Sequence, residues 1–292
     1  MSIVSRFPIG AYSMSHSSKQ KKSQMTMSQG ADRHELYELS VQCSEAEVDF
    51  VMDTFKKLRG RKPALVREDF CGTANVCCEW VRRDKKLEAI GVDLDPEVLA
   101  WGQQHNLAKL REQQRKRIHL LQEDVLKVKT RTPDIICAMN FSYWLLKERA
   151  TLKQYFITVL EALKPDGIFF LDAYGGYDSF RELEEEREVE TPDGDMVTYV
   201  WEQASFNPIN HDVTCYIHFL FEDDSRMDQA FTYHWRLWVL PEIQDLLHEV
   251  GFKVTIYWQG WAEDGEPDGE FEPATEGDAD AGWICYIVAE KP

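Results

Sequence analysis

Residues 64–93 place the strongest constraint on the fold of this 292-residue chain. They open with a short apolar run, pass through a turn of small residues around Gly72, and then follow helical periodicity from Asn75 to Arg83. A second apolar run ends on Asp93, about 20 residues beyond the glycine, as in nucleotide-binding β-α-β units. The segment therefore predicts a parallel β-α-β unit with a ligand at the carboxyl ends of its strands.

The turn lacks two glycines of the dinucleotide-binding fingerprint. Phe70 and Ala74 stand where the flanking glycines would be, so the turn does not suggest a cradle for a pyrophosphate. A helix N-terminus still offers free N–H groups, and Asp93 can accept hydrogen bonds from both hydroxyls of a ribose. A nucleoside ligand without phosphates fits this pattern better than a dinucleotide.

Two stretches, EDFCGTAN at 68–75 and GVDLDPE at 91–97, resemble the first two motifs of the class I, Rossmann-like S-adenosylmethionine-dependent methyltransferases. The first motif of that family has an acid before its glycine turn, and either Glu68 or Asp69 would take that place here. An ordinary α/β turn without a ligand is the alternative. The resemblance implies S-adenosylmethionine as the cofactor, held by Glu68, Asp69, Cys71, Gly72, Thr73, Asp93, Leu94, Asp124, Val125 and Asn140.

Later segments continue the resemblance in the expected order, to about Glu290. Asp124 and Val125 follow the third predicted strand and resemble the family's adenine contact, with one carboxylate acceptor and one backbone N–H donor. The phrase LKPDGIFFLD at 163–172 is similar to the family's turn and fifth strand. The resemblance implies an α/β, Rossmann-like fold with a seven-stranded, mostly parallel sheet whose last strand is reversed.

The chain divides into three predicted regions. Residues 1–30 are Ser-rich and contain no acid, so we expect a disordered tail. Residues 31–62 have helical character, and the resemblance makes them a helical cover over the cofactor; the methyltransferase domain follows over 63–292. Ser44 and Glu47 fit a capping box, which predicts that a helix begins there.

Within the domain, alternating patterns predict a small antiparallel β insertion at about 190–238. Its three strands are expected at 197–206, 212–221 and 227–238. The acidic run before it, 179–190, is predicted to be a solvated helix, and the acidic segment 262–281 an exposed loop. Many small-molecule methyltransferases of the family cover their substrate with such an insertion, so the resemblance implies a small-molecule substrate.

The segment after the fourth predicted strand mixes polar and aromatic residues, and the resemblance places it beside the methyl-donating sulfur. Asn140 and Tyr143 are therefore candidates for orienting a substrate. Asp172 and Tyr174 end the fifth strand and lie on the same edge of the sheet, where open α/β sheets bind ligands. We take Tyr143, Asp172, Tyr174 and Trp235 as the predicted substrate-binding residues.

Methyl transfer uses an already activated donor, so the protein mainly supplies position and a dry site. A base is needed only when the acceptor atom carries a proton. The possible bases are His211, His234, Tyr143 and Asp172, and we take Tyr143 and His234 as the catalytic candidates. Because a lone histidine is more often structural, that alternative stays open for His234.

Aromatic residues crowd the C-terminal half of the chain, and some of them could line a pocket for a cationic amine through cation–π contacts. Core packing of the small sheet is the alternative. These residues are Tyr233, Trp235, Trp238, Tyr257, Trp258 and Trp261. The formal net charge of −18 favours a cationic ligand.

The same acidity argues against affinity for a phosphate backbone, so no nucleic-acid partner is expected. The basic cluster at 109–117 is the only support for the alternative of a protein or RNA methyltransferase. A catalytically inactive S-adenosylmethionine-binding protein is a further alternative, because the glycines around Gly72 are missing. A Rossmann oxidoreductase is a third, although the phosphate-binding glycines are absent.

Seven cysteines occur without a C-x-x-C pair, which indicates reduced thiols in a cytoplasmic protein and no metal site. No apolar run approaches the ~18 residues of a membrane-spanning helix, so no membrane partner is expected. Neither the acceptor atom nor the oligomeric state follows from the sequence.

Overall fold

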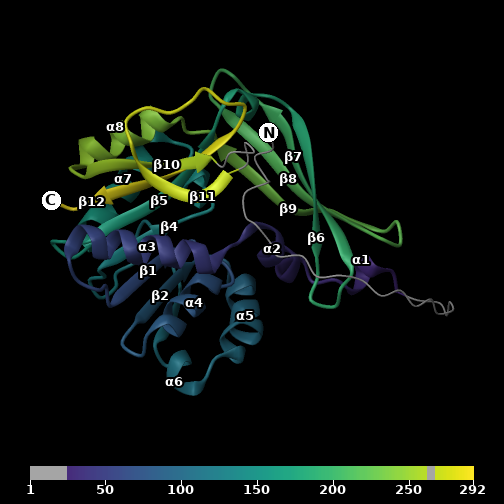
Figure 1. Cartoon of the computed structure of the whole chain (residues 1–292), viewed down its shortest axis with the longest axis horizontal. Helices are drawn as coiled ribbons and strands as arrows, with labels where there is room; N and C mark the ends of the chain where they lie inside the picture. The colour runs from purple at the N-terminus through teal and green to yellow at the C-terminus, as the bar shows by residue number, and fades with distance from the viewer. Residues whose placement is uncertain (1–24, 262–266) are drawn as a thin grey trace.

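A computed structural model describes residues 25–261 and 267–292 of the chain (Figure 1). Most of the predicted tail, residues 1–24, lies outside these ranges, as does the part of the acidic segment at 262–266. Residues 25–30, also predicted to belong to the tail, include the short helix α1 (Met27–Gly30). None of the helices in the described ranges combines the length and the apolar character needed to cross a membrane.

The main sheet has eight strands in the order β11-β10-β12-β5-β4-β1-β2-β3. The five strands β1 to β5 are parallel neighbours, whereas β12 runs antiparallel to both β5 and β10. The predicted mostly parallel sheet with a reversed last strand is therefore confirmed. Its strands are β1 (Leu65–Asp69), β2 (Glu88–Asp93), β3 (Ile118–Gln122), β4 (Ile135–Ala138), β5 (Ile168–Gly175), β10 (Lys253–Trp261), β11 (Pro267–Ala274) and β12 (Trp283–Glu290).

The eighth strand, β11, corrects the prediction of seven strands. It forms within the acidic segment 262–281, which was expected to be an exposed loop, and pairs antiparallel with the edge of β10. Phe271 anchors it, because its ring packs against Tyr286 at 4.5 Å and Phe50 at 6.1 Å between centroids. One aromatic side chain and an open strand edge are enough to order a segment whose composition indicates a loop.

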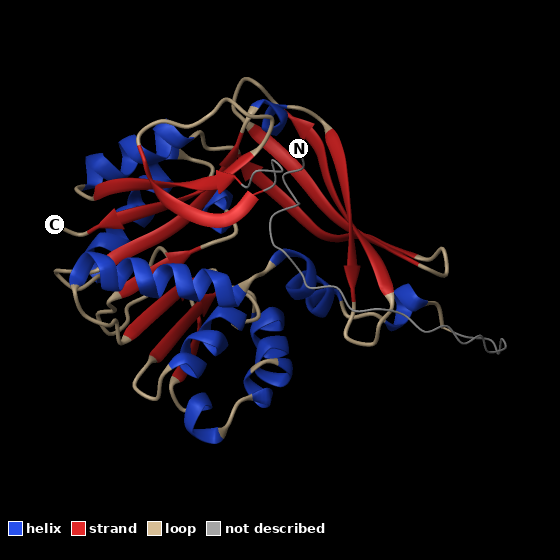
Figure 2. Ribbon diagram, in the orientation of Figure 1, coloured by secondary structure: helices blue, strands red, loops and turns tan. Residues whose placement is uncertain are grey.

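Helices cover both faces of the main sheet (Figure 2). Residues of α3, α4 and α5 share one buried cluster with one face of the sheet, and residues of α7 and α8 share another with the opposite face. Because both faces are covered, β1, β4 and β5 are buried along their whole length. The longer helices are α2 (Arg33–Val41), α3 (Ser44–Arg59), α4 (Asn75–Arg83), α5 (Pro96–His105), α7 (Arg149–Ala162) and α8 (Leu240–Val250); the short ones are α6 (Glu112–Arg115), η1 (Leu107–Lys109), η2 (Ser142–Leu145) and η3 (Tyr177–Phe180).

The predicted β insertion is a second, antiparallel sheet in the order β6-β7-β8-β9, which stands beside the main sheet in Figure 1. Its strands are β6 (Leu183–Glu190), β7 (Met196–Phe206), β8 (Asp212–Phe221) and β9 (Arg226–Arg236). The three expected strands are confirmed, but the helix expected at 179–190 is wrong, because most of that run is β6. The strand is hard to recognise in the sequence because glutamates occupy most of its positions. In the sheet, Leu183 pairs with Gln203 of β7 and Val189 pairs with Val197.

The N-terminal helices join the two sheets. The backbone N–H groups of Met27 and Ser28 donate to Asp223 and Ser225 in the turn between β8 and β9. Helix α3 begins at Ser44, as predicted, but its N-cap is Cys43 and no side chain caps it. The predicted capping box with Ser44 as the N-cap is therefore absent.

Candidate cofactor and substrate site

The turn after β1 keeps a glycine-type backbone at positions that are not glycine. Gly72 has a φ of 52°, and Phe70 and Ala74 have φ values of 59° and 58°. All three lie in the left-handed region, which residues other than glycine rarely adopt. A Cβ at Gly72 would meet nothing within 4 Å. The turn therefore has the form of the family's first motif and leaves room for a ligand at its centre.

Asp93 lies against this turn, as the sequence predicted. Its Oδ2 accepts a hydrogen bond from the Gly72 N–H at 2.8 Å, and its Oδ1 accepts one from the Asp95 N–H at 2.9 Å. Each carboxylate oxygen keeps a second lone pair for a ligand hydroxyl. Leu94 follows with 68% of its surface exposed. Helix α5 approaches the turn closely because Gly102 has no Cβ, which would lie 2.3 Å from the Thr73 carbonyl.

Asp124 and Val125 lie beyond the end of β3, in the next strand position along the same edge. Asp124 Oδ1 accepts from the Leu126 N–H at 2.9 Å, and Oδ2 pairs with Lys127 at 3.0 Å. The Val125 N–H has no acceptor within the described residues. An unused donor next to a carboxylate is the arrangement expected for an adenine contact.

The two acids at the end of β1 point to opposite faces of the sheet. Glu68 accepts from the Cys77 N–H at 3.1 Å at the start of α4, and burial raises the pKa of its carboxyl to about 7. Asp69 is paired with Arg67 and accepts from the Tyr155 hydroxyl at 2.9 Å on the other face. Of the two predicted candidates, only Glu68 lies on the face of the sheet that carries α4, the helix that follows the turn. Asp69 belongs to a buried ion pair on the opposite face.

The remaining turn residues contribute in different ways. Cys71 is buried, and its N–H donates to the Val92 carbonyl, so it holds β1 to β2. The Thr73 hydroxyl donates to Glu38 of α2, which also accepts from the Asn106 amide at 2.5 Å. Glu38 was not predicted, and no local pattern could have found it, since the contact joins residues 35 positions apart.

The segment after β4 is held in an unusual conformation by Asp172 of β5. Asn140 and Phe141 both have left-handed backbones, with φ values of 56° and 57°. Their N–H groups donate to the two oxygens of the Asp172 carboxylate at 2.8 and 2.9 Å. The Tyr143 hydroxyl donates to the Asp172 carbonyl at 2.8 Å. The structure thus brings together Asn140, Tyr143 and Asp172, as the sequence predicted.

A cavity of about 120 Å³ opens beside this segment, between the main sheet, α2, α3 and the second sheet. We call it the aromatic pocket. The charged groups on its wall are Glu47, Asp172 and Arg187. Its aromatic wall includes Tyr37, Phe141, Tyr174, Tyr199, Trp201, Tyr233, Trp235, Phe271 and Tyr286. The predicted substrate residues Asp172, Tyr174 and Trp235 therefore lie together on one cavity.

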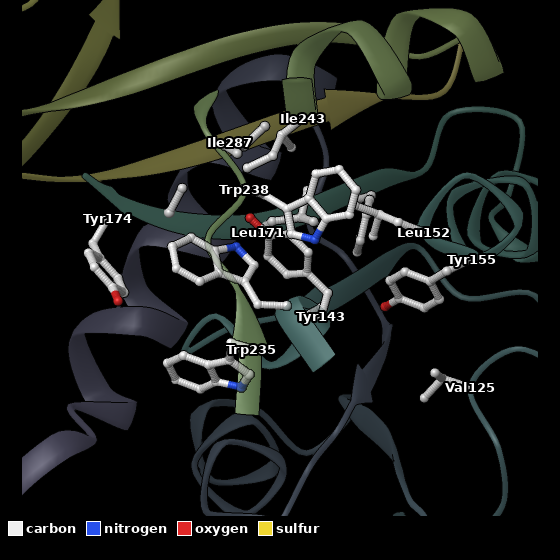
Figure 3. Close-up of a cluster of buried hydrophobic side chains, with 14 of the residues drawn as sticks. Val125, Tyr143, Leu152, Tyr155, Leu171, Tyr174, Trp235, Trp238, Ile243 and Ile287 are labelled. Atoms are coloured by element: carbon white, nitrogen blue, oxygen red, sulfur yellow. The ribbon is translucent and has the colours of Figure 1, made fainter. Parts of the chain in front are cut away.

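Two other predictions are not supported by the geometry. Tyr143 lies in the packed cluster shown in Figure 3, fully buried, and burial raises the pKa of its hydroxyl well above the usual value, so it is a poor base. His234 is exposed on the outer face of β9, opposite Trp235, and contacts Thr214 at 3.3 Å. Neither Tyr143 nor His234 lies on the wall of the aromatic pocket. The geometry therefore supports neither their predicted catalytic roles nor the substrate contact predicted for Tyr143.

The aromatic prediction divides in the same way. Tyr233 and Trp235 line the pocket, with ring centroids 4.4 Å apart. Trp238 packs in the core near Tyr143 (Figure 3), and Trp258 packs on Trp283 with centroids 4.8 Å apart. Tyr257 packs on Phe50 instead. The side chain of Trp261 lies outside the described residues.

Residues 69–171 match the family model described as methyltransferase domain. No curated protein sequence matches the chain significantly. The solved structure of CalS10, an amino pentose methyltransferase from Micromonospora echinaspora, is 14% identical and superposes with a TM-score of 0.66 over 94% of this chain and 100% of that chain.

Two further structures have the same fold. An S-adenosylmethionine-dependent methyltransferase from Clostridium acetobutylicum is 17% identical, with a TM-score of 0.63 over 88% of this chain and 96% of its own. The sugar N-methyltransferase KedS8 from Streptoalloteichus is 16% identical, with a TM-score of 0.61 over 95% of this chain and 99% of its own. At these identities the superpositions establish the fold.

The fold and the matched domain define a class I, Rossmann-like S-adenosylmethionine-dependent methyltransferase. Residues 69–171 carry the match to the methyltransferase domain, and S-adenosylmethionine is the cofactor of the protein. The residues present fit that group: the space at Gly72, the free lone pairs of Asp93, the exposed Leu94 and the unused Val125 N–H all lie on one edge.

Proposed function

We propose that this methyltransferase acts on the amine nitrogen of a small molecule held in the aromatic pocket. The observation that carries the proposal is a pair of buried carboxylates, Glu47 and Asp172, on a wall otherwise made largely of aromatic rings. Ionised carboxylates in such surroundings need a cationic partner. An ammonium group provides one, and the ring faces attract the same charge.

The electrostatics of the pocket favour a cation in a second way. Burial raises the pKa of Glu47 to about 8 and that of Asp172 to about 7, because the charged form of each carboxyl is poorly solvated there. A bound ammonium would restore the charged form of both groups. Arg187 lies on the same wall, but its guanidinium donates to the Ser40 carbonyl and packs over the Tyr199 ring at 5.6 Å.

Polar atoms without partners indicate that the ligand also carries hydroxyl groups. The indole N–H groups of Trp201 and Trp235 and the side-chain oxygens of Ser40 and Gln259 are buried on this wall. None of these four atoms has a hydrogen-bond partner within the described residues. Buried polar groups normally have partners, so a ligand that carries hydrogen-bond donors and acceptors would supply the missing ones.

The names of the structural neighbours agree with this class of acceptor. CalS10 is described as an amino pentose methyltransferase and KedS8 as a sugar N-methyltransferase. A concave pocket lined largely by aromatic side chains also suits a small molecule. These points support an amine of a small hydroxylated molecule as the substrate class.

When bound, S-adenosylmethionine supplies a methyl group already activated on a sulfonium sulfur, and the chain contributes position and exclusion of water. We assign cofactor binding to the edge formed by Glu68, Gly72, Asp93, Leu94, Val125 and Asn140. Asp172 fixes the backbone of Asn140 and Phe141, so it sets the boundary between that edge and the aromatic pocket.

The test is a labelling experiment on a metabolite extract. The extract is separated into cationic, neutral and anionic fractions, and each is incubated with the full chain and S-adenosylmethionine that carries a deuterated methyl group. We expect labelled product from the cationic fraction, with the label on nitrogen by mass spectrometry. Label only in neutral or anionic metabolites, or only in added protein or RNA, would overturn the proposal.

A further inference from the structure

The two carboxylates of the aromatic pocket differ in how much of their hydrogen-bonding capacity is in use. Both oxygens of Asp172 accept backbone N–H groups, at 2.8 and 2.9 Å. Glu47 Oε2 is buried and has no hydrogen-bond partner within the described residues. Only 5% of the Glu47 residue is exposed. Both oxygens of Asp172 are therefore used by the backbone, whereas Glu47 Oε2 keeps acceptor capacity toward the cavity. The polar neighbours of the Glu47 carboxyl are the Asn140 side chain and the Cys43 backbone, which offset in part the rise in its pKa that burial causes.

The local structure explains why Glu47 points inward. It occupies the first turn of α3, where a glutamate side chain can accept a hydrogen bond from the backbone N–H of the N-cap residue. The N-cap is Cys43, which makes no side-chain bond. The Cys43 backbone and the Asn140 side chain both act on the Glu47 carboxyl. Val48, Val51 and Phe55 bury the same side of α3 in the core. The helix N-terminus also favours a negative charge at this point.

We propose that Glu47 is the catalytic residue that binds the acceptor ammonium and takes its proton before methyl transfer. The inference rests on the proposed function and adds a named residue to it. Glu47 lies on the wall of the aromatic pocket together with Asn140, whose side chain acts on its carboxyl. Asn140 is also the residue we assign to the cofactor edge, so Glu47 lies on the side of the pocket where the acceptor nitrogen has to approach the cofactor.

The proton balance is simple. An N–H bond of the ammonium breaks, an O–H bond forms on Glu47 Oε2, and the electron pair stays on nitrogen as the lone pair that bonds to the methyl group. The product nitrogen is again a cation, and the proton on Glu47 is released to solvent as the product leaves. No oxidant or further reactant is required. Burial makes this carboxyl a stronger base than an ordinary glutamate.

Other titratable groups surround Glu47 and shape its pH dependence. Asp172 of β5 and Glu68 of β1 add to the rise in the pKa of Glu47, after burial itself. Besides burial, the charge of Glu47 contributes to raising the pKa of four neutral neighbours: the phenols of Tyr37 and Tyr286 and the thiols of Cys43 and Cys137. Burial raises the pKa of all four, so they stay neutral near pH 7. Between pH 6 and 9 the charge of the site is then set by the three carboxyls.

The experiment compares a cationic probe with a neutral probe of the same shape. Cyclohexylamine and cyclohexanol are titrated calorimetrically into the full chain saturated with S-adenosylhomocysteine, at several pH values and in two buffers of different ionisation enthalpy. The variants are Glu47→Gln and a matched control, Glu45→Gln. Glu45 lies in the same first turn of α3 but is exposed, so its change removes the same charge outside the pocket.

For the parent chain we expect tighter binding of cyclohexylamine than of cyclohexanol, improving as pH rises through the pKa of Glu47. Below that pKa, binding should release about one proton, because Glu47 must ionise to pair with the ammonium. Glu47→Gln should weaken cyclohexylamine roughly tenfold to a hundredfold and lose its pH dependence and proton release. Cyclohexanol should be unaffected, and Glu45→Gln should behave as the parent.

The outcomes separate the two proposals. A parent chain that binds cyclohexylamine no better than cyclohexanol would overturn the amine pocket itself. A parent that prefers the amine, with a Glu47→Gln variant that keeps this preference and the proton release, would overturn only the role of Glu47. Equal loss of both probes in Glu47→Gln would mark a purely structural residue and would also refute the inference.

Discussion

At the scale of single residues, Phe70 and Ala74 keep a left-handed backbone that costs residues other than glycine roughly 1–2 kcal/mol each. Short hydrogen bonds hold the turn in place: Gly72 donates to Asp93 at 2.8 Å, and Ala74 donates to the Cys71 carbonyl at 2.8 Å. The absence of two motif glycines therefore does not indicate a degenerate turn. Asp93 therefore has two roles: it stabilises the conformation of the turn through the Gly72 N–H, and its remaining lone pairs are available to bind the ligand.

Replacing Asp93 by alanine tests that double role. Asp93→Ala should bind S-adenosylhomocysteine roughly tenfold to a hundredfold more weakly, because charge-assisted hydrogen bonds to the ribose are lost. Calorimetry gives the affinity, and circular dichroism checks the fold. Asp95→Ala is the control, since Asp95 caps α5 through the Glu97 N–H and should lose about 1 kcal/mol of stability with no change in affinity. A folded Asp93→Ala chain with the parent's affinity would contradict the assignment.

At the scale of elements, α2 links the cofactor edge to the aromatic pocket. Its N-cap, Asp32, accepts from the Trp101 indole N–H of α5 at 2.6 Å, and Glu38 accepts from Thr73 and Asn106. Tyr37, between them, lines the pocket and packs on Phe231 of β9 at 4.9 Å. One short helix thus contacts the cofactor turn, α5 and the second sheet at once.

Removing the Glu38 side chain should loosen α2 without disturbing the sheet. Glu38→Ala leaves the buried Thr73 hydroxyl without its acceptor and leaves the Asn106 amide with only the Thr73 carbonyl at 3.2 Å, which should lower the free energy of unfolding by about 1–3 kcal/mol. Hydrogen exchange should become faster in residues 33–41 and stay unchanged in β4 and β5. Glu35→Ala on the exposed side of α2 is the control. Unchanged exchange in α2 would show that Glu38 does not anchor it.

The same elements show what the sequence could predict. The unit from β1 to Asp93 follows local periodicity and a spacing fixed by the chain, so its form and the position of Asp93 were predictable. Strand β6 was not predictable, because its many glutamates favour a helix. Leu183 and Val189 lie on one face of the strand, and that pattern indicates a strand only once β7 is known to pair with it. Glu47 fits a capping pattern locally, and only the packing of α3 shows that it points inward. Glu38 depends on a contact with Thr73 that no local signal encodes.

At the scale of the whole molecule, three buried carboxyls meet where α3, β1 and β5 come together. Burial raises the pKa of Glu47 to about 8 and those of Glu68 and Asp172 to about 7. Each pKa lies above the value of the unfolded chain, so the folded state holds more protons. The stability they contribute is fully present below about pH 4 and is lost as pH rises to about 8. Without a bound cation, the free energy of unfolding therefore falls as these three carboxyls lose their protons.

The free energy of unfolding of the chain without ligands should consequently fall between pH 5 and pH 8. Each of the three groups contributes up to about 1.4 kcal/mol per pH unit while it is protonated in the folded state only. His34 opposes this in part, because burial lowers its pKa and its stabilisation grows with pH. Urea denaturation at each pH measures the slope, and Glu47→Gln should flatten it by about one proton, whereas Glu45→Gln should not. Stability that rises across this range, or an unchanged slope in Glu47→Gln, would mean that Glu47 is ionised in the folded chain and paired with a cation other than the substrate.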